Sequence, residues 1–573
     1  MLSVDSRKVP LYRFDVLVVG GGAAGAAAAW ASAEAGVEVA LLVKSDLEET
    51  NTLYAQGGMA AVLSAADSFE AHVADTLRVG CGLSERETVE HVVRGGPEAV
   101  ERLVGWGACF DREPVDREPV DRDAVDRAAS GEEGSGSFAL SREGGHSRSR
   151  VVHRGDATGR EIQLTVGAAI ERHPRITTFA RTFVVDLLCA ADGRAVGALV
   201  LTANGDLAVF SGGQVILAAG GAGQIYRETT NPQGATGDGV AIGFRAGAIV
   251  RDIEFFQFHP TLLYIAGAAR VLISETVRGA GGVLRDRDGV RFMPDHHPAA
   301  ELAQRDVVSR AVFERMVATG DTSVYLDLSD VEGDPHQLFP GISRICHYFG
   351  IDIARDPVPV RPGAHYMIGG LEVDADGHTT VPGLWAVGEC ASSGLHGANR
   401  MGSNSLLECV VLGTRAGAGA ARRLADRGIV DFEVRPPRDR PTAPVGMKVN
   451  ITDVTYSLKS MMWRQLGVER EGAAMEDASA KIALWVRAVQ ELAPDEPATW
   501  ELMNMLTVAQ LTALGARVRE ESRGVHYRSD FPEADPAWCA HTRMRPVFEE
   551  GRVVAVDITR KSVPNSTPSL ATA

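Results

Sequence analysis

The chain has 573 residues, long enough for roughly three or four domains. Its composition, 45% hydrophobic and 23% charged, is typical of globular proteins. Its formal net charge of -17 at pH 7 argues against nucleic acid or an anionic membrane as a partner, so an anionic substrate would need a local cluster of Arg and His. The seven scattered cysteines form no C-x-x-C pair, and the sequence has neither an apolar leader nor a run of about 18 apolar residues, so we expect a cytoplasmic protein without a disulfide framework or metal site.

A glycine-rich turn near the amino terminus carries the clearest local signal. The apolar run 16–19 leads into Gly20, Gly22 and Gly25 at GxGxxG spacing, and an Ala-rich segment and a second apolar run, 37–43, follow. This order predicts a βαβ unit in which the first glycine turns the chain tightly, the second admits a pyrophosphate against bare backbone, and the third lets helix and strand pack closely. The helix would direct its free N–H groups at the phosphates. We therefore predict a dinucleotide site.

The residues after this unit modify the prediction. An acidic side chain about 20 positions further on usually holds a ribose hydroxyl in NAD-binding units, but Lys44 stands there, so the ribose contact must differ. Residues 51–63 form a polar, glycine-bearing segment whose backbone could wrap a flat ring. Residues 84–107 show helical periodicity, with Ser84 and Glu87 at the spacing of a capping box.

A charged repeat interrupts the first half of the chain. Residues 111–127 repeat a Pro-containing unit with a five-residue period, and a Gly/Ser-rich stretch follows. Such a segment has little to bury, so we expect a solvated, mobile surface insertion over 111–137, with a partner-docking arm as the alternative.

The rest of the chain changes character several times. A strand-rich section, 182–217, ends where an apolar run meets glycines, and Asp238 follows at a helix start, where its carboxylate could cap the helix or bond a ribityl or ribose hydroxyl. Composition becomes mixed polar and loop-rich over 255–365, and residues 381–421 return to strand, glycine and helix, so the first domain is expected to be discontinuous. Beyond a Pro/Arg-rich linker, amphipathic patterns over 455–525 favour a helical bundle.

A set of His, Arg and hydroxyl side chains beside Gly, Pro or short polar motifs is the candidate chemical centre. Each residue alone has an ordinary explanation as a core histidine or a solvated charge. Together they match the needs of a small substrate with two carboxylates, because Arg binds carboxylate in a bidentate manner. The set is His259, Ser274, Glu275, Arg278, Arg305, His365 and Arg400.

Six short motifs along the chain are typical of one protein family. They are AQGG (55–58), TGDG (236–239), FHPT (258–261), RDVVSRA (305–311), HGANR (396–400) and NSLLE (404–408). Over roughly residues 14–530 the chain resembles the succinate dehydrogenase/fumarate reductase flavoprotein superfamily. The resemblance implies an α/β fold with a discontinuous Rossmann-type FAD-binding domain (1–254 and 366–433), an inserted α+β capping domain (255–365), a C-terminal helical bundle domain (445–540) and a tail (541–573).

Within that superfamily the chain most resembles the L-aspartate oxidase family, and two positions carry this resemblance. Asn51 stands where the membrane-complex dehydrogenases carry a His that bonds covalently to FAD, which implies noncovalent FAD. Glu143, in REGGHS, corresponds to the glutamate that meets the substrate ammonium in this family. A diacid without an amine would be repelled by a carboxylate there.

The same resemblance implies a role for each site residue. Glu143, His259, Ser274, His365 and Arg400 would bind substrate, Arg305 would transfer the proton, and Glu275 with Arg278 would relay protons to it. Because free guanidinium has a pKa above ~12, Arg305 can act only if its neighbours stabilise its neutral form. The FAD contacts would be Gly20, Gly22, Ala23, Ala24, Gly25, Lys44, Asn51, Thr52, Ala55, Gln56, Gly57, Gly58, Asp238, Glu389, Ser405 and Leu406.

The activity implied is oxidation of L-aspartate to iminoaspartate, the first step of NAD biosynthesis through quinolinate, with O2 or fumarate as electron acceptor. Quinolinate synthase is a candidate functional partner, and the protein would be a monomer or homo-oligomer that binds neither nucleic acid nor membrane. A soluble fumarate reductase, a flavoprotein subunit of a succinate dehydrogenase/fumarate reductase complex, and an inactive FAD-binding homologue are the alternatives.

Overall fold

The computed structural model describes residues 9–113, 136–265, 270–427, 449–491, 496–549 and 552–563. Its largest sheet has seven strands in the order β6-β2-β1-β9-β8-β7, with β16 paired to β9. β1 lies parallel to both β2 and β9, so the two strands that lead into glycines end at the same edge of the sheet. The strands are β1 (Leu11–Val19), β2 (Val39–Leu42), β6 (Ile176–Phe179), β7 (Phe183–Cys189), β8 (Ala195–Leu201), β9 (Leu207–Leu217) and β16 (Leu384–Ala386).

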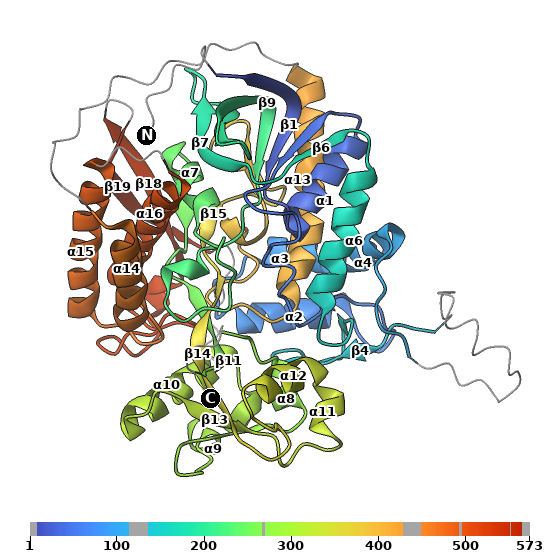
Figure 1. The fold of residues 1–573 in the computed structure, drawn as a ribbon, viewed down its shortest axis with the longest axis vertical. Coiled ribbons are helices and arrows are strands. Elements are labelled where there is room, and N and C mark those ends of the chain that lie inside the picture. Colours follow the sequence, from blue (N-terminus) through green and yellow to red (C-terminus); the bar gives the residue numbers. More distant parts are fainter. Residues whose placement is uncertain are drawn as a thin grey trace, which may run out of the picture.

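Two helices far apart in the sequence, α1 (Ala23–Glu34) and α13 (Asn404–Arg427), pack side by side against this sheet (Figure 1). Their close approach depends on small residues: a Cβ placed on Gly413 would lie 2.5 Å from Ala24 O, and one on Gly417 would lie 2.2 Å from Ala28 O. The late segment that contains β16 and α13 thus builds one layer together with the amino-terminal βαβ unit.

Shorter elements surround this layer. The helices are α2 (Phe69–Val79), α3 (Arg86–Arg94), α4 (Gly96–Trp106), α6 (Thr158–Arg172) and α7 (Asp238–Arg245), and a small sheet holds β3 (Met59–Ala60), β4 (Leu140–Ser141) and β5 (Val151–Val152). The capping box predicted at Ser84 and Glu87 is wrong. The N-cap residue of α3 is Glu85, and Ser84 Oγ has no hydrogen-bond partner among the described residues.

The middle of the chain forms a second layer, at the bottom of Figure 1. Its four-stranded sheet has the order β11-β14-β13-β12, and its helices pack on that sheet around a separate hydrophobic core. The strands are β11 (Phe256–Leu263), β12 (Val283–Arg285), β13 (Val324–Asp327) and β14 (Val358–Met367), and the helices are α8 (Glu275–Gly279), α9 (Met293–His296), α10 (Arg305–Thr319), α11 (Pro335–Leu338) and α12 (Pro340–Tyr348).

The carboxyl-terminal part combines helices with a hairpin. Helices α14 (Ile451–Gln465), α15 (Gly472–Glu491) and α16 (Pro497–Val518) pack together at the left of Figure 1. The tail expected over 541–573 is corrected here, because β18 (Ala540–Glu549) and β19 (Arg552–Ser562) pair as a hairpin. β18 also pairs with β10 (Val250–Arg251), in a sheet completed by β15 (Gly370–Glu372) and β17 (Ala391–Ser392).

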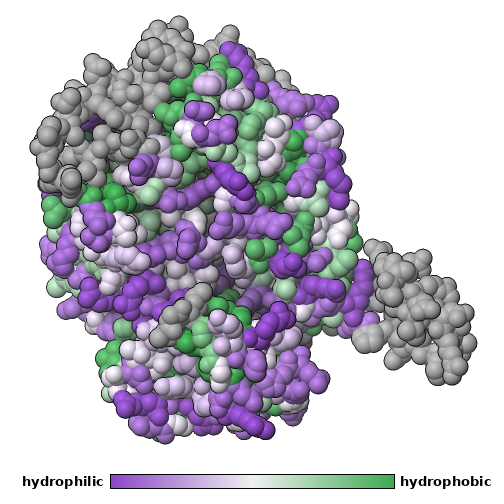
Figure 2. All heavy atoms as spheres, in the orientation of Figure 1, coloured by the Kyte–Doolittle hydropathy of each residue, from purple (hydrophilic) through white to green (hydrophobic). Residues whose placement is uncertain are grey.

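Two predicted segments fall on positions outside the described residues: most of the insertion over 111–137, and the Pro/Arg-rich linker (434–444). In the part of the chain that the structure does describe, no helix has the length and apolar character needed to cross a membrane. On the face drawn in Figure 2, hydrophilic side chains predominate and hydrophobic ones form separate patches, as expected for a chain of net charge -17.

Candidate active site

A cavity of about 1850 Å³, including the space at its mouth, lies where the two layers meet. Its lining extends from the glycine turn to the Arg and His side chains, so one space joins the predicted dinucleotide site to the predicted substrate site. All predicted site residues line it except Gly25 and Arg278. Those that do are Gly20, Gly22, Ala23, Ala24, Lys44, Asn51, Thr52, Ala55, Gln56, Gly57, Gly58, Glu143, Asp238, His259, Ser274, Glu275, Arg305, His365, Glu389, Arg400, Ser405 and Leu406.

The glycine turn forms one wall of the cavity. Gly20 has φ 113°, a left-handed conformation that favours glycine, and Gly22, the N-cap residue of α1, has no side chain of its own to cap the helix. The Ala23 N–H donates to Thr52 Oγ1 (3.1 Å), and the next N–H groups of the helix start beside the cavity. Gly25 does not line the cavity but packs against the glycine turn, because a Cβ placed on it would lie 1.9 Å from Gly20 O. This is the close packing expected of the third glycine, and the contact of Gly25 with the cofactor stays a prediction.

Several buried polar atoms around the cavity have no partner among the described residues. They are Asn51 Oδ1, Gln56 Oε1 and Asn231 Oδ1. Buried polar groups are normally hydrogen-bonded, so these atoms are available to a bound ligand. The glycine cradle and these free oxygens fit the phosphates, ribityl hydroxyls and polar ring edge of FAD.

Lys44 and Asp238 form an ion pair at the cavity wall (Nζ–Oδ2, 2.8 Å), and Lys44 also lies 2.5 Å from Glu501 Oε1 of α16. Burial lowers the pKa of Lys44, but the two carboxylates outweigh burial, so its pKa is raised and the side chain stays charged. Asp238 does not cap α7, because Gly237 is the N-cap residue.

Asn51 and Glu389 meet on another wall. Asn51 Nδ2 donates to Glu389 Oε2 (2.8 Å), and the Met367 N–H donates to Glu389 Oε1 (2.9 Å). Burial raises the pKa of the Glu389 carboxyl. An amide at position 51 lacks the nucleophilic nitrogen of a histidine ring, so this wall offers hydrogen bonds and no covalent attachment.

Two guanidinium groups converge at the substrate end. Arg305 Nη1 and Arg400 Nη1 each lie 3.3 Å from Gln257 Oε1, and Arg400 Nε donates to Ser405 Oγ. Burial, and then the charge of Arg305, lower the pKa of Arg400 to about 10, so it stays cationic at neutral pH. Arg400 makes no ion pair with any described residue, which leaves its charge to be balanced by an anion.

Two neutral histidines stand nearby, with ring centroids 5.2 Å apart. His259 Nδ1 accepts from the Thr261 N–H (3.3 Å), which places the ring proton on Nε2. His365 Nδ1 lies 3.0 Å from Thr230 Oγ1. Burial, followed by the charge of Arg305, holds the pKa of both rings well below 6.5.

Ser274 begins α8 and faces the same space. Its Oγ accepts from the Thr276 N–H (3.3 Å) and from Thr276 Oγ1 (2.9 Å). Because both of these bonds use its lone pairs, its own hydroxyl proton is free to be donated to a substrate oxygen.

Glu143 is buried beside the arginines. Its Oε2 accepts from Ser403 Oγ (2.7 Å). A Cβ placed on Gly402 would lie 2.7 Å from Glu143 Oε2 and 3.1 Å from Arg305 Nη2, so the carboxylate and the guanidinium flank one backbone position. Burial, and then the charge of Glu275, raise the pKa of Glu143.

The loop that carries Glu143 is held by a buried ionic cluster. Arg150 pairs with Asp67 (Nε–Oδ2, 2.8 Å) and with Asp75 of α2 (Nη1–Oδ2, 2.7 Å). The same Asp75 oxygen accepts from the N–H and the hydroxyl of Ser147, both at 2.7 Å. These bonds fix the backbone just after Glu143.

Glu275 connects the remaining predicted residues. Its Oε2 accepts from Arg305 Nε (2.7 Å), and its Oε1 accepts from the Gly144 N–H (2.9 Å). The pKa of Glu275 is about 2, because Arg305 and Arg278 outweigh the effect of burial. Arg278 Nη2 lies 3.8 Å from Glu275 Oε2 and does not line the cavity. Arg278 can therefore act on a substrate only through Glu275.

The sequence analysis missed Gln257, Tyr366 and Ser403. Gln257 accepts from both guanidiniums, the Tyr366 ring lies 4.6 Å from Arg400 Cζ, and Ser403 orients Glu143. Gln257 lies two residues before the candidate His259 on β11, but the pairing of β11 with β14 is irregular between Gln257 and Phe258, so strand alternation gave no usable signal for it.

Comparison with protein families finds two matches. A family described as FAD binding domain matches residues 15–406, and one described as Fumarate reductase flavoprotein C-term matches residues 455–568. Proteins named L-aspartate oxidase are similar over most of their length. The one from Synechocystis sp. is 39% identical over 92% of this chain and 96% of its own. Those from Streptomyces coelicolor (40%; 95% and 93%) and Mycobacterium tuberculosis (41%; 90% and 92%) are comparable.

Solved structures show the same architecture. E. coli quinol fumarate reductase FrdA superposes with a TM-score of 0.85 at 31% identity over 98% of both chains. Mycobacterium smegmatis Sdh1 superposes with a TM-score of 0.80 at 31% identity over 97% of this chain and 95% of its own. These similarities confirm the predicted fold class.

Proposed function

The chain belongs to the L-aspartate oxidase family of FAD-binding flavoproteins, and on that premise we propose that it oxidises L-aspartate to iminoaspartate in NAD biosynthesis through quinolinate. One observation carries the proposal: the Glu143 carboxylate is buried beside Arg305 at the substrate end of the dinucleotide cavity. A site with cations for two carboxylates and an anion for an ammonium group matches the charges of L-aspartate.

FAD would be held noncovalently by the glycine turn, the Asn51–Gly58 segment, Glu389 and Ser405, and when bound it supplies the two-electron oxidation. The free oxygens of Asn51 and Gln56 support this assignment. The ion pair of Lys44 with Asp238 would offer a ribose or ribityl hydroxyl both a donor and an acceptor.

The substrate carboxylates would be bound by Arg400, His259, His365 and Ser274. Arg400 has unpaired charge and free N–H groups, so it suits a carboxylate in bidentate geometry. The histidines are neutral, which lets each act as a donor without adding charge that would repel the ammonium group. Glu143 would accept from that ammonium group.

We assign proton transfer to Arg305. Its Nε is bonded to Glu275, which leaves its terminal nitrogens directed to the substrate end. Glu275 and then Arg278 would carry the proton away.

Addition of L-aspartate to the FAD-loaded protein without oxygen tests the activity. We expect the flavin absorbance to bleach in the wild type, and Arg400→Leu to retain FAD but bleach at least ~100-fold more slowly, because a buried charged contact is lost. The exposed Arg86→Leu is the matched control. Normal bleaching of Arg400→Leu would show the carboxylate assignment to be wrong.

A second candidate is fumarate reduction. The FrdA similarity at a TM-score of 0.85 and the shared dicarboxylate chemistry favour fumarate as an electron acceptor alongside O2. Protein that reduces fumarate with a reduced dye but leaves aspartate untouched would favour this candidate. Quinolinate synthase remains a proposed functional partner, because an imine product hydrolyses in water and benefits from prompt use.

We further propose that the described parts of 1–254 and 366–433 form the FAD-binding domain. The described parts of 255–365 would form its capping domain, because β11 and β14 of that layer bring His259 and His365 to the cavity.

A further inference from the structure

Arg400 stands at the end of a loop that is held from both sides at Ala398. The Ala398 N–H donates to Gly80 O (3.0 Å), and its carbonyl accepts from the Val525 N–H (3.0 Å). A Cβ on Gly397 would lie 2.4 Å from Gly80 O, so the loop fits tightly against the end of α2. Val525 belongs to a turn of the C-terminal part, Arg523–His526, which we call the C-terminal turn.

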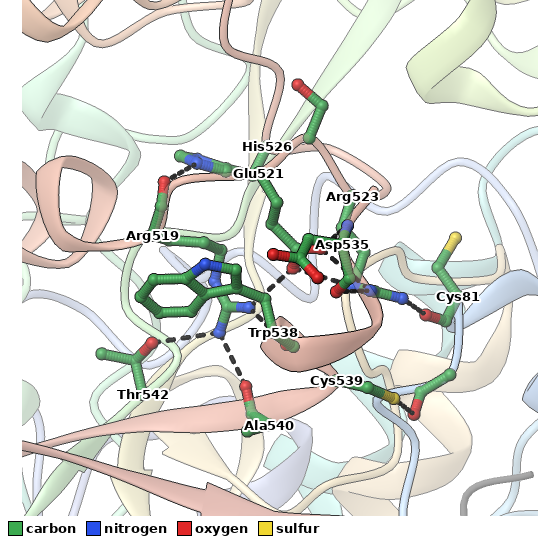
Figure 3. Close-up of polar contacts among 12 residues, drawn as sticks. Cys81, Arg519, Glu521, Arg523, His526, Asp535, Trp538, Cys539, Ala540 and Thr542 are labelled. Atoms are coloured by element: carbon green, nitrogen blue, oxygen red, sulfur yellow. Dashed lines mark hydrogen bonds and ion pairs between the residues drawn. The ribbon is translucent and has the colours of Figure 1, made fainter. Parts of the chain in front are cut away.

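Buried Arg519 fixes the chain that leads into the C-terminal turn (Figure 3). A guanidinium has five N–H donors, and all five have an acceptor here. Nε donates to Glu254 Oε1 (2.8 Å), Nη1 to Glu521 Oε1 (2.9 Å) and Trp538 O (3.0 Å), and Nη2 to Ala540 O (2.9 Å) and Thr542 Oγ1 (3.0 Å).

Glu521 joins Arg519 to Arg523. Its Oε1 accepts from both guanidiniums (2.9 and 2.8 Å), and its Oε2 accepts from Arg523 Nη2 (2.9 Å), as Figure 3 shows. Arg523 Nη1 donates in turn to the carbonyl of Cys81 (2.8 Å). The C-terminal turn is therefore bonded to the same segment after α2 that holds Ala398 from the opposite side.

The next residue of the loop connects it to Arg305. Asn399 Nδ2 donates to Gln304 Oε1 and to Asp306 Oδ1, both at 3.0 Å, and these two residues flank Arg305. A displacement of the loop at Ala398 would therefore move Arg400 and disturb the start of α10.

We propose that Arg523, Gly524 and Val525 are positioning residues for Arg400, so that the C-terminal part completes the dicarboxylate site. The inference rests on the proposed function in taking Arg400 as the carboxylate-binding group. Gly524 has φ 54°, and its Cβ would lie 2.3 Å from Ala398 O, so only glycine lets the turn approach the loop. Bidentate binding of a carboxylate tolerates little displacement of the guanidinium.

Gly524→Ala tests this inference, with Gly350→Ala as the matched control. Gly350 has φ 76°, and no described atom lies within 4 Å of its Cβ, so both variants strain the backbone but only Gly524→Ala displaces Ala398. Fumarate binding is measured on the FAD-loaded enzyme from the change in flavin absorbance. We expect its dissociation constant, and KM for L-aspartate, to rise by about 10- to 100-fold in Gly524→Ala. FAD content should equal that of the control, since a merely structural defect would lower it.

Equal fumarate dissociation constants in Gly524→Ala and Gly350→Ala would overturn the inference. If Gly524→Ala does not fold, Arg523→Lys replaces it: the lysine keeps the charge but loses the planar fork that binds Glu521, and the exposed Arg517→Lys is its control.

Arg400→Leu separates this inference from the proposed function. Normal fumarate binding by Arg400→Leu would overturn both. Lost binding in Arg400→Leu, together with normal binding in the Gly524 or Arg523 variant, would overturn the positioning role alone.

Discussion

Glu143 places a second buried carboxylate, besides Glu275, next to the cations Arg305 and Arg400. Ser403 holds its orientation through a 2.7 Å hydrogen bond, and Ser403 itself has φ 62°, a left-handed conformation that is uncommon for a non-glycine residue. Burial disfavours the charged form of Glu143 and raises its pKa, so the carboxylate gains most from a ligand that brings a positive charge. L-aspartate brings an ammonium group and fumarate does not.

Glu143→Gln tests this argument, because the amide keeps the shape and loses the charge. The pKa of Glu143 is raised above 4.5, so aspartate binding should strengthen as the pH rises through that raised pKa and the carboxylate forms. KM for L-aspartate should rise about 10- to 100-fold in Glu143→Gln. The ratio of the fumarate KM to the aspartate KM should increase with pH in the wild type and stay flat in the variant. A pH-dependent ratio that survives in Glu143→Gln would contradict the assignment.

The close packing of α1 against α13 depends on glycines, which have no side chain to separate the two helices. Gly413 and Gly417 of α13 lie against the backbone of α1, and α1 is built largely of alanine. This contact holds the amino end of α1, which follows the glycine turn that we propose as the phosphate site. Close packing of the two helices thus supports cofactor binding.

Gly417→Ala should destabilise the protein, although alanine favours helices. The new Cβ would lie 2.2 Å from Ala28 O, and such overpacking costs about 1–3 kcal/mol. Gly105→Ala in α4 is the control, because its Cβ would meet no described atom within 4 Å, and there alanine should stabilise by ~1 kcal/mol. Thermal unfolding and FAD retention measure both. A higher unfolding midpoint for both variants would refute the packing argument.

Across the whole molecule, a buried cluster joins the amino-terminal layer to the C-terminal hairpin. His541 of β18 lies 2.5 Å from Asp252 and 3.4 Å from Glu85, and Glu85 also pairs with Arg251 (2.7 Å). Arg519 Nη2 lies 3.9 Å from Asp252. Burial lowers the pKa of His541, but the Asp252 and Glu85 carboxylates outweigh burial, so its pKa is raised above 6.5. Asp252 has its pKa lowered below 3.8, because His541, Arg251 and Arg519 together outweigh burial.

The stabilisation from this pair should depend on pH. A histidine with a raised pKa stabilises fully below 6.5 and loses its contribution as the pH rises through the raised value. An aspartate with a lowered pKa stabilises above 3.8 and loses its contribution as the pH falls through the lowered value. The pair is therefore strongest between these limits.

His541→Gln should lower stability by ~3–5 kcal/mol near pH 6, and by less at a pH above the raised pKa of His541, where the wild-type ring has lost its charge. The midpoint of thermal unfolding at the two pH values measures this difference. The control is His336→Gln, which breaks a half-exposed pair with Asp352 and should change stability by ~1 kcal/mol or less. An equal loss at both pH values would argue against an ionic contribution from His541.

Residues that short local motifs singled out in the sequence do come together at one cavity. The GxGxxG turn and most of the predicted site residues, including Arg305 and Arg400, line the cavity as expected. Arg278 lies 3.8 Å from Glu275, and its relay role stays a prediction. Prediction from sequence failed at the start of α3, which Ser84 does not cap. It also left the β18–β19 hairpin as a tail, because an edge strand with an exposed face has no strong pattern of its own.

The amino-acid sequence by itself determined the dinucleotide turn, the family and the types of residue at the active site, because each depends on residues close together in the chain. Only the tertiary structure decided which of them meet. Ser403 orients Glu143 from 260 positions away, and the C-terminal turn holds the Arg400 loop. Such distances follow from the packing of all layers at once, and no local pattern encodes them.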